Sequence, residues 1–268
     1  MHHKVLISIL LSFLTFYAFS QSTASVNVNT FELETGEDCF KKKIWIYLPA
    51  GYEKTDKHYP VIYMHDAQNL FDKETSYVGE WQIDESLDSI QEPKAIIVGI
   101  EHGGEKRIDE LTPFPHENYG GGKGDAYVNF IVRTLKPYID ENYRTLKDQS
   151  NTGIFGSSLG GLISYYAALK YPDIFGKVGV YSPSFWFNEK IYDLTKETQF
   201  DNTTKFYFLV GTEESDEMVP DLKRMVKILN EKGLDPAQIQ TKIIEGGKHN
   251  ESMWAENFTE SYLWLMKN

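Results

Sequence analysis

A serine framed by glycines is the first group in this sequence with an evident chemical use. Ser158 lies at the centre of Gly156-Ser157-Ser158-Leu159-Gly160, between the apolar run 152–155 and an amphipathic stretch that follows. A Gly-x-Ser-x-Gly segment in that setting is typical of a nucleophile elbow, a sharp strand-to-helix turn that lifts the serine hydroxyl above a sheet. The pattern predicts Ser158 as the nucleophile of an acyl transfer. Ser157 does not fit, because its flanking positions carry side chains.

A serine hydroxyl is a poor nucleophile near neutral pH and needs a base within hydrogen-bond reach. In folds with a nucleophile elbow, the chain order is nucleophile, acid, histidine. Seven histidines are present, and His249 alone follows Ser158. We therefore expect His249 to be the base. His65 is the rival, but it precedes the serine.

The acid that orients the base is expected after the apolar run 205–210. The segment 211–217 supplies four carboxylates there, Glu213, Glu214, Asp216 and Glu217. Such an acid holds the histidine tautomer and stabilises the imidazolium. The pattern predicts that one of these residues is the acid and does not choose among them.

Acyl transfer also needs N–H donors for the oxyanion that develops on the substrate. One donor is expected from the backbone of Leu159, directly after the nucleophile. The second is expected from the loop 65–71, where Ala67 or Gln68 can present an unobstructed amide. We favour Gln68.

These residues need a sheet to hold them. Short apolar runs rich in β-branched and aromatic residues predict seven strands, several of them apolar throughout, as in parallel strands covered on both faces. Their ranges are 43–48, 61–64, 95–100, 152–155, 177–181, 205–210 and 240–244.

Amphipathic stretches alternate with the strands. Helices are expected from Asp125 to a bend or end at Pro137, and over 159–169, 221–231 and 251–266. The alternation predicts an α/β fold with a mostly parallel central sheet and helices on both faces. The segment 102–124, with six glycines and two prolines, is expected to be a long functional loop.

The first twenty residues have the pattern of a secretory signal peptide. Lys4 precedes an apolar run from Val5 to Phe19, and Ala18-Phe19-Ser20 is a small-x-small cleavage pattern. The run is short for a membrane helix. We expect residues 1–20 to be a signal peptide and residues 21–268 a single domain, exported to a bacterial periplasm or exterior without stable membrane insertion.

Composition excludes several other classes of protein. A net charge of −12 disfavours a nucleic-acid binder, and a single cysteine allows no internal disulfide. A hydrophobic content of 41 % is enough for a large core. No His/Asp cluster has the spacing of metal ligands, so neither a metal nor another cofactor is expected.

Four segments in order resemble a known family. They are Tyr63-Met64-His65-Asp66-Ala67-Gln68-Asn69-Leu70-Phe71-Asp72, then Glu80-Trp81, then 156–161, then Gly247-Lys248-His249-Asn250-Glu251 with Trp254. The chain from about Val26 onward resembles the esterase family of α/β-hydrolases that includes enterochelin esterases, esterase D, and feruloyl and acetylxylan esterases. The resemblance implies the α/β-hydrolase fold and a serine esterase without a cofactor.

The resemblance also assigns residues. It carries the nucleophile to Ser158, the base to His249 and the second oxyanion donor to Gln68. A Gly-x-x-Glu segment of the family maps the acid to Glu214, with Asp216 in reserve, although some siderophore esterases of the family resemble Ser–His dyads. Arg107 and Glu110 match a family Arg-x-x-Glu element, which implies that the long loop lies beside the active site.

The expected substrate is a small-molecule or oligosaccharide ester, either an acylated sugar or polysaccharide or a siderophore-type ester. Arg107, with Lys123, is expected to attract an anionic catecholate, and Phe185 and Trp186 to stack on an aromatic acyl group or sugar. Two other functions remain open. An acyltransferase would use the same triad, and a binding protein on a hydrolase scaffold would need no catalysis.

Overall fold

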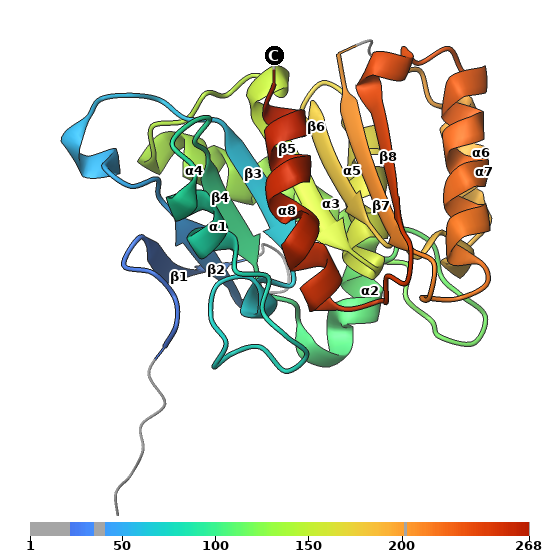
Figure 1. Ribbon diagram of the computed structural model, residues 1–268, viewed down its shortest axis with the longest axis horizontal. Helices are drawn as coiled ribbons and strands as arrows, with labels where there is room; N and C mark the ends of the chain where they lie inside the picture. Colours follow the sequence, from blue (N-terminus) through green and yellow to red (C-terminus); the bar gives the residue numbers. More distant parts are fainter. Residues whose placement is uncertain (1–21, 35–40, 201–202, 268) are drawn as a thin grey trace, which may run out of the picture.

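A computed structural model describes residues 22–34, 41–200 and 203–267 of the chain. Its centre is one eight-stranded sheet in the order β1-β2-β4-β3-β5-β6-β7-β8 (Figure 1). The strands are β1 (Val28–Glu34), β2 (Lys41–Tyr47), β3 (Val61–His65), β4 (Ile96–Ile100), β5 (Thr152–Ser157), β6 (Lys177–Tyr181), β7 (Lys205–Gly211) and β8 (Ile239–Ile244).

The sheet is parallel from β4 through β3 to β8 and antiparallel at one edge. Strand β2 pairs antiparallel with both β1 and β4. The next strands pair in parallel, with Tyr63 opposite Val98 and Phe155 opposite Gly179. The expected α/β fold with a mostly parallel sheet is confirmed, and its carboxyl ends form one common edge.

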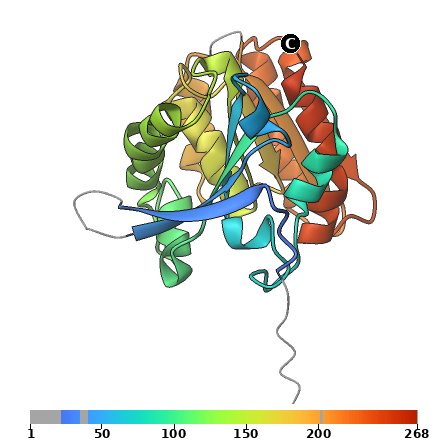
Figure 2. The same cartoon turned by 90° about the vertical axis from the view of Figure 1, so that its left-hand side faces the viewer.

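Helices cover both faces of this sheet (Figure 2). One face packs on α3 (Gly124–Phe130), α4 (Lys136–Asn142), α5 (Leu159–Lys170), α6 (Lys190–Glu197) and α7 (Met218–Glu231); the other packs on α1 (Ile83–Ser89) and α8 (Glu251–Met266). Successive strand residues alternate between the two layers: Ile44 packs on the first face and Trp45 on the second. This two-residue period explains why the inner strands read as continuous apolar runs.

Three features of the local structure go beyond what the sequence predicted. Strand β1 was not among the predicted strands. Of the two outcomes expected at Pro137, an end is excluded: α3 continues through a π-helical turn at Ile131–Leu135 into α4, and the proline lies in the first turn of α4. The long loop 102–124 contains a short helix, α2 (Arg107–Leu111), so it is partly ordered by its own hydrogen bonds.

Within the described ranges, none of the helices combines the length and the apolar character that crossing a bilayer requires. The proposed signal peptide at residues 1–20 lies outside the described residues.

Candidate active site

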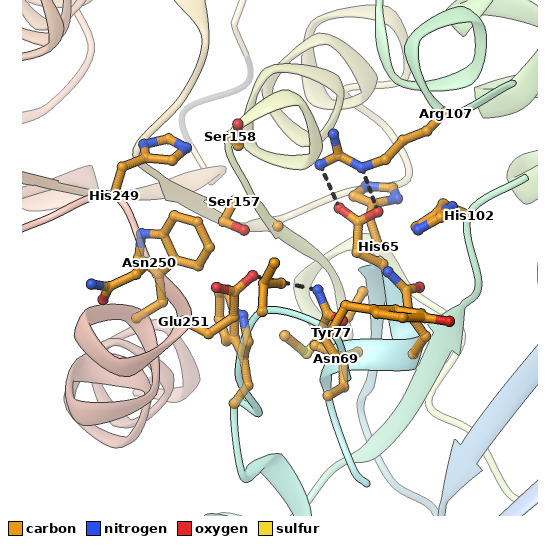
Figure 3. A pocket seen from close by; sticks show the side chains of 18 residues that line it. His65, Asn69, Tyr77, His102, Arg107, Ser157, Ser158, His249, Asn250 and Glu251 are labelled. Carbon is orange, nitrogen blue, oxygen red and sulfur yellow. Dashed lines mark hydrogen bonds and ion pairs between the residues drawn. The ribbon is translucent and has the colours of Figure 1, made fainter. Parts of the chain in front are cut away.

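The carboxyl edge of the sheet carries a cavity of about 540 Å³. Ser158 and His249 both line it, as do Gln68 and Arg107 (Figure 3). In Figure 3 the imidazole of His249 is turned toward Ser158. Each of these residues follows the carboxyl end of a parallel strand (β3, β4, β5 or β8), so the sheet brings residues from distant parts of the sequence to one edge.

Ser158 occupies a strained turn between β5 and α5. Its φ is 57° and its ψ −123°, a combination that L-residues rarely adopt and that costs about 1–3 kcal/mol. Its N–H donates to the Tyr181 carbonyl oxygen at 2.9 Å, and its Oγ lies 3.4 Å from the Ser184 Oγ. The turn presents the hydroxyl at the N-terminus of α5, where the helix dipole favours developing negative charge.

The flanking glycines make this turn possible. A Cβ added at Gly156 would lie 2.6 Å from the Gly160 carbonyl oxygen, and one at Gly161 would lie 2.8 Å from the Tyr181 carbonyl oxygen. A Cβ at Gly160 would meet its nearest neighbour, the Cβ of His65, at 3.3 Å. The chain therefore packs backbone against backbone around the serine, which the motif requires.

His249 is held by a buried carboxylate. Its Nδ1 lies 2.7 Å from Oε2 of Glu214, whose side chain is 1 % exposed. The second oxygen of Glu214 accepts from the Gly211 N–H at 2.5 Å and from the Ser182 Oγ at 2.7 Å. Glu214 is thus fixed to the ends of β6 and β7. This arrangement can hold a proton on Nδ1 of His249 and leave Nε2 free to act as a base.

The other carboxylates of the segment 211–217 do not contact His249. Glu213 is exposed and pairs with Lys248 at 4.0 Å, and Asp216 is exposed as well. Of the carboxylates that sequence reasoning left open, the structure brings Glu214 to the histidine.

Ser182 and Trp254 complete the support of this pair. The Trp254 Nε1 donates to the Ser182 Oγ at 2.8 Å, and its ring meets the edge of the His249 ring at a centroid distance of 5.1 Å. Sequence reasoning assigned neither residue a role. The sequence pointed to them only by their positions: Ser182 directly follows β6, and Trp254 lies in the first turn of α8.

The rival histidine has a different environment. His65 is buried, and its Nδ1 lies 2.8 Å from the Tyr127 hydroxyl. Burial lowers its pKa to about 4, so its ring is neutral at physiological pH. Its backbone ends β3 directly before the loop that carries Gln68.

The loop after β3 begins with a left-handed residue. Asp66 has φ 56° and ψ 45°, and the 3₁₀ turn Ala67–Asn69 follows it. Among the described residues, the N–H groups of Gln68 and Leu159 make no hydrogen bond to the protein. Both residues belong to segments that border the cavity, so both amides are available as oxyanion donors.

Arg107 clamps the first residue of this loop. Its Nε and Nη2 donate to the two oxygens of Asp66 at 2.8 and 2.9 Å. Burial alone would raise the pKa of Asp66, but the guanidinium outweighs it and holds that pKa below its usual value. The position of Arg107 in α2 does place the long loop beside the cavity. Its contacts, however, are to the protein's own turn.

The two aromatic residues expected to contact substrate do not line the cavity. Phe185 is fully buried between Tyr165 and Tyr192, so it is a core residue. Trp186 is 44 % exposed and forms an aromatic cluster with His116 and Tyr119 of the long loop. The cavity instead uses Trp81 and Trp254, whose rings pack at 5.7 Å.

A polar pair also lines the cavity. Glu251 at the start of α8 accepts from the Asn69 Nδ2 at 3.4 Å, and Figure 3 shows this pair beneath Ser157. Burial raises the pKa of Glu251. Neither residue was predicted as part of the site, although both lie in the segments that carry the family resemblance.

Comparison with known proteins agrees with this architecture. A family model described as "Putative esterase" matches residues 40–265. YbbA of Bacillus subtilis, an uncharacterized protein, is 29 % identical over 237 residues, which cover 84 % of this chain and 92 % of YbbA.

Two relatives carry names that state an activity. The ferri-bacillibactin esterase BesA of Bacillus subtilis is 31 % identical over 59 % of this chain and 56 % of BesA. An endo-1,4-beta-xylanase/feruloyl esterase of Xylanibacter ruminicola is 28 % identical over 55 % of this chain and 20 % of that protein. In structure, the BES protein of Bacillus cereus superposes with a TM-score of 0.72 at 21 % identity, covering 93 % of this chain and 98 % of its own.

Proposed function

Because the chain belongs to the "Putative esterase" family of α/β-hydrolases, we propose that it is a serine carboxylic ester hydrolase that works through an acyl-enzyme. The observation that carries the proposal is the contact of His249 with the buried Glu214, at 2.7 Å, in the cavity that Ser158 also lines. Nucleophile, acid and base (Ser158, Glu214 and His249) follow one another in the chain order that is typical of the fold.

The reaction follows from these positions. The Ser158 Oγ attacks the ester carbonyl carbon while Nε2 of His249 takes its proton. The tetrahedral oxyanion is stabilised by the N–H groups of Gln68 and Leu159. The bond to the alcohol oxygen breaks, His249 returns the proton to that oxygen, and an acyl-serine remains. Water activated by His249 then attacks the acyl-serine, releasing the acid and restoring the serine.

The substrates that we propose are siderophore-type esters and acylated sugars or polysaccharides. The names of BesA and of the Xylanibacter relative support these two classes. A cavity of about 540 Å³ has the size of a small-molecule site. Its indole walls suit an aromatic acyl group, and the polar pair Asn69–Glu251 suits substrate hydroxyl groups.

A fluorophosphonate probe tests the mechanism. We expect stoichiometric labelling of the full chain, mapped by peptide mass spectrometry to Ser158, and loss of the label in Ser158→Ala. Labelling at another residue, or none, would exclude the proposed nucleophile. Turnover of a catecholate trilactone, a feruloyl ester and acetylated xylan would then rank the substrate classes.

The oxyanion turn gives a second prediction. Arg107→Lys keeps the charge but loses the paired hydrogen bonds to Asp66, so the turn that carries Gln68 shifts. We expect kcat to fall by about 10- to 100-fold with little change in KM. A rise in KM with unchanged kcat would instead make Arg107 a substrate-binding residue.

The matched control for that experiment is Arg224→Lys. Arg224 makes the same type of paired contact, to Glu189, on the exposed surface of α7. Because surface ion pairs contribute little to stability, this variant is expected to retain wild-type kinetics.

We also propose that residues 1–20 are a signal peptide and that residues 21–268 form one exported domain. The first described residues support the boundary: the Ser22 Oγ donates to Asp72 at 2.6 Å and the Ser25 N–H to Asp84 at 2.6 Å. The chain is thus packed on the domain almost directly after the expected cleavage site. N-terminal sequencing of the protein from a periplasmic or culture fraction should begin at Gln21.

A further inference from the structure

Three carboxylates converge beside the cavity, where the loop after β3 enters α1. Glu80, Asp84 and Glu85 each place an oxygen within 4.8 Å of the other two. Asp84 is fully buried, Glu80 is half-buried and Glu85 is exposed. The group therefore reaches from the protein interior to solvent, and it lies outside the catalytic residues described above.

One oxygen of the buried member has no partner. Asp84 Oδ2 accepts from the Ser25 N–H at 2.6 Å, whereas Oδ1 is inaccessible to solvent and has no hydrogen bond to the described residues. Leaving a buried acceptor unsatisfied costs about 1–3 kcal/mol, and more if the group is charged. An unpartnered carboxylate oxygen beside two further carboxylates indicates a position for a positively charged ligand.

The surrounding protein supplies little positive charge. Within the described chain, none of the three carboxylates forms an ion pair with a lysine, arginine or histidine. Burial raises the pKa of Asp84 to about 7, with a contribution from Glu85. The pKa of Glu80 is also raised, by burial and by the nearby charges of Glu85 and Asp72. Lys73 opposes this shift without cancelling it.

We propose that Glu80, Asp84 and Glu85 bind a divalent cation, with Ca²⁺ as the best match. Calcium takes oxygen ligands at about 2.3–2.6 Å, so two oxygens on one ion lie no more than about 5 Å apart. The separation of the three oxygens meets that limit. The buried Asp84 Oδ1 gains its missing partner, and the exposed side at Glu85 leaves room for water ligands.

The site would hold the turn that carries Trp81, which lines the cavity. Trp81 lies between Glu80 and Asp84 in sequence, and its ring packs on Tyr181 at 5.0 Å. Gln82 has a left-handed φ of 54°. A cation that joins Glu80 to Asp84 fixes this turn and hence the position of Trp81 in the cavity. Binding is therefore expected to change tryptophan fluorescence as well as stability.

Calorimetry on the full chain tests the site. The protein is treated with EDTA, dialysed at about pH 7.5 and titrated with CaCl₂ to about 10 mM, beyond the range of weak extracellular calcium sites. We expect saturable binding of one ion and a rise in the melting temperature. Asp84→Asn should weaken binding by about tenfold or more, because it removes the buried charged ligand. Glu80→Gln, at a half-buried position that tolerates change more readily, should weaken it as well.

The control is Glu141→Gln, which removes one charge from the exposed surface of α4 on the other face of the sheet and should bind Ca²⁺ as the wild type does. Absence of saturable binding in the wild type would overturn the proposal. So would unchanged affinity in both Asp84→Asn and Glu80→Gln. If Ca²⁺ has no effect and Asp84→Asn simply raises the melting temperature, the carboxylates share a proton and no cation. All these readouts are independent of esterase activity, so the proposed function and this site can fail separately.

Discussion

Ser158→Ala is expected to lower kcat/KM for a small aryl acetate by about 10⁴-fold or more. The substitution removes the attacking oxygen and leaves the backbone and the cavity in place. The neighbouring Ser184 Oγ lies 3.4 Å from the Ser158 Oγ, but Ser184 is not part of the strained turn at the N-terminus of α5, so we do not expect it to replace the nucleophile. Initial rates on purified wild-type and variant protein, at equal folded concentration, measure the effect.

Ser157→Ala is the matched control for this loss. Ser157 is the adjacent residue, also lines the cavity, and is the last residue of β5. It precedes the strained turn rather than occupying it, so we expect kcat/KM within about tenfold of the wild type. Near-normal turnover in Ser158→Ala, or loss confined to Ser157→Ala, would assign the chemistry to a different nucleophile.

Glu214→Gln is expected to cost about 10³- to 10⁴-fold in kcat, with the fold intact. The Gly211 N–H and the Ser182 hydroxyl both donate to one oxygen of Glu214, so the glutamine carbonyl must take that position. Its NH₂ group then faces Nδ1 of His249 and donates to it. The histidine proton is forced onto Nε2, and the ring can no longer accept the proton of Ser158.

Glu213→Gln makes the same change one residue earlier, at an exposed position, and should leave kcat near the wild-type value. Comparison of the two variants by steady-state kinetics separates the buried acid from the general negative charge of this loop. If both variants lose less than about tenfold, a Ser158–His249 dyad is sufficient and the role assigned to Glu214 is wrong.

Much of the sheet could be predicted because its inner strands, β3 to β7, are buried on both faces. The seven predicted strands correspond to β2 through β8, with ends that differ by at most two residues. Strand β1 was missed because it lies at the edge and most of its residues are exposed or half-buried, so its sequence lacks an apolar run. Sequence left open whether the helix ends or bends at Pro137; the structure shows that it continues through a π-helical turn at Ile131–Leu135, a turn that no local pattern predicts.

The site was predictable where chain order constrains it. Ser158 stands in a motif with a known turn, and one histidine follows it. The choice among the carboxylates was different, since it depends on which side chain turns inward after β7. The direction of a side chain was also unpredictable at Phe185 and Trp186. The two aromatic residues are adjacent in sequence, but Phe185 is buried in the core and Trp186 is exposed.

The backbone at Ser158 also sets a limit on how stable this protein can be. A residue held at φ 57° and ψ −123° is a permanent thermodynamic burden, because unfolding releases the strain. Glycine adopts such angles freely, so Ser158→Gly is expected to melt a few degrees above the wild type in thermal denaturation while being unable to turn over substrate. Selection for robustness and selection for catalysis thus act in opposite directions on a single residue, and a variant library screened for heat resistance alone would discard the nucleophile.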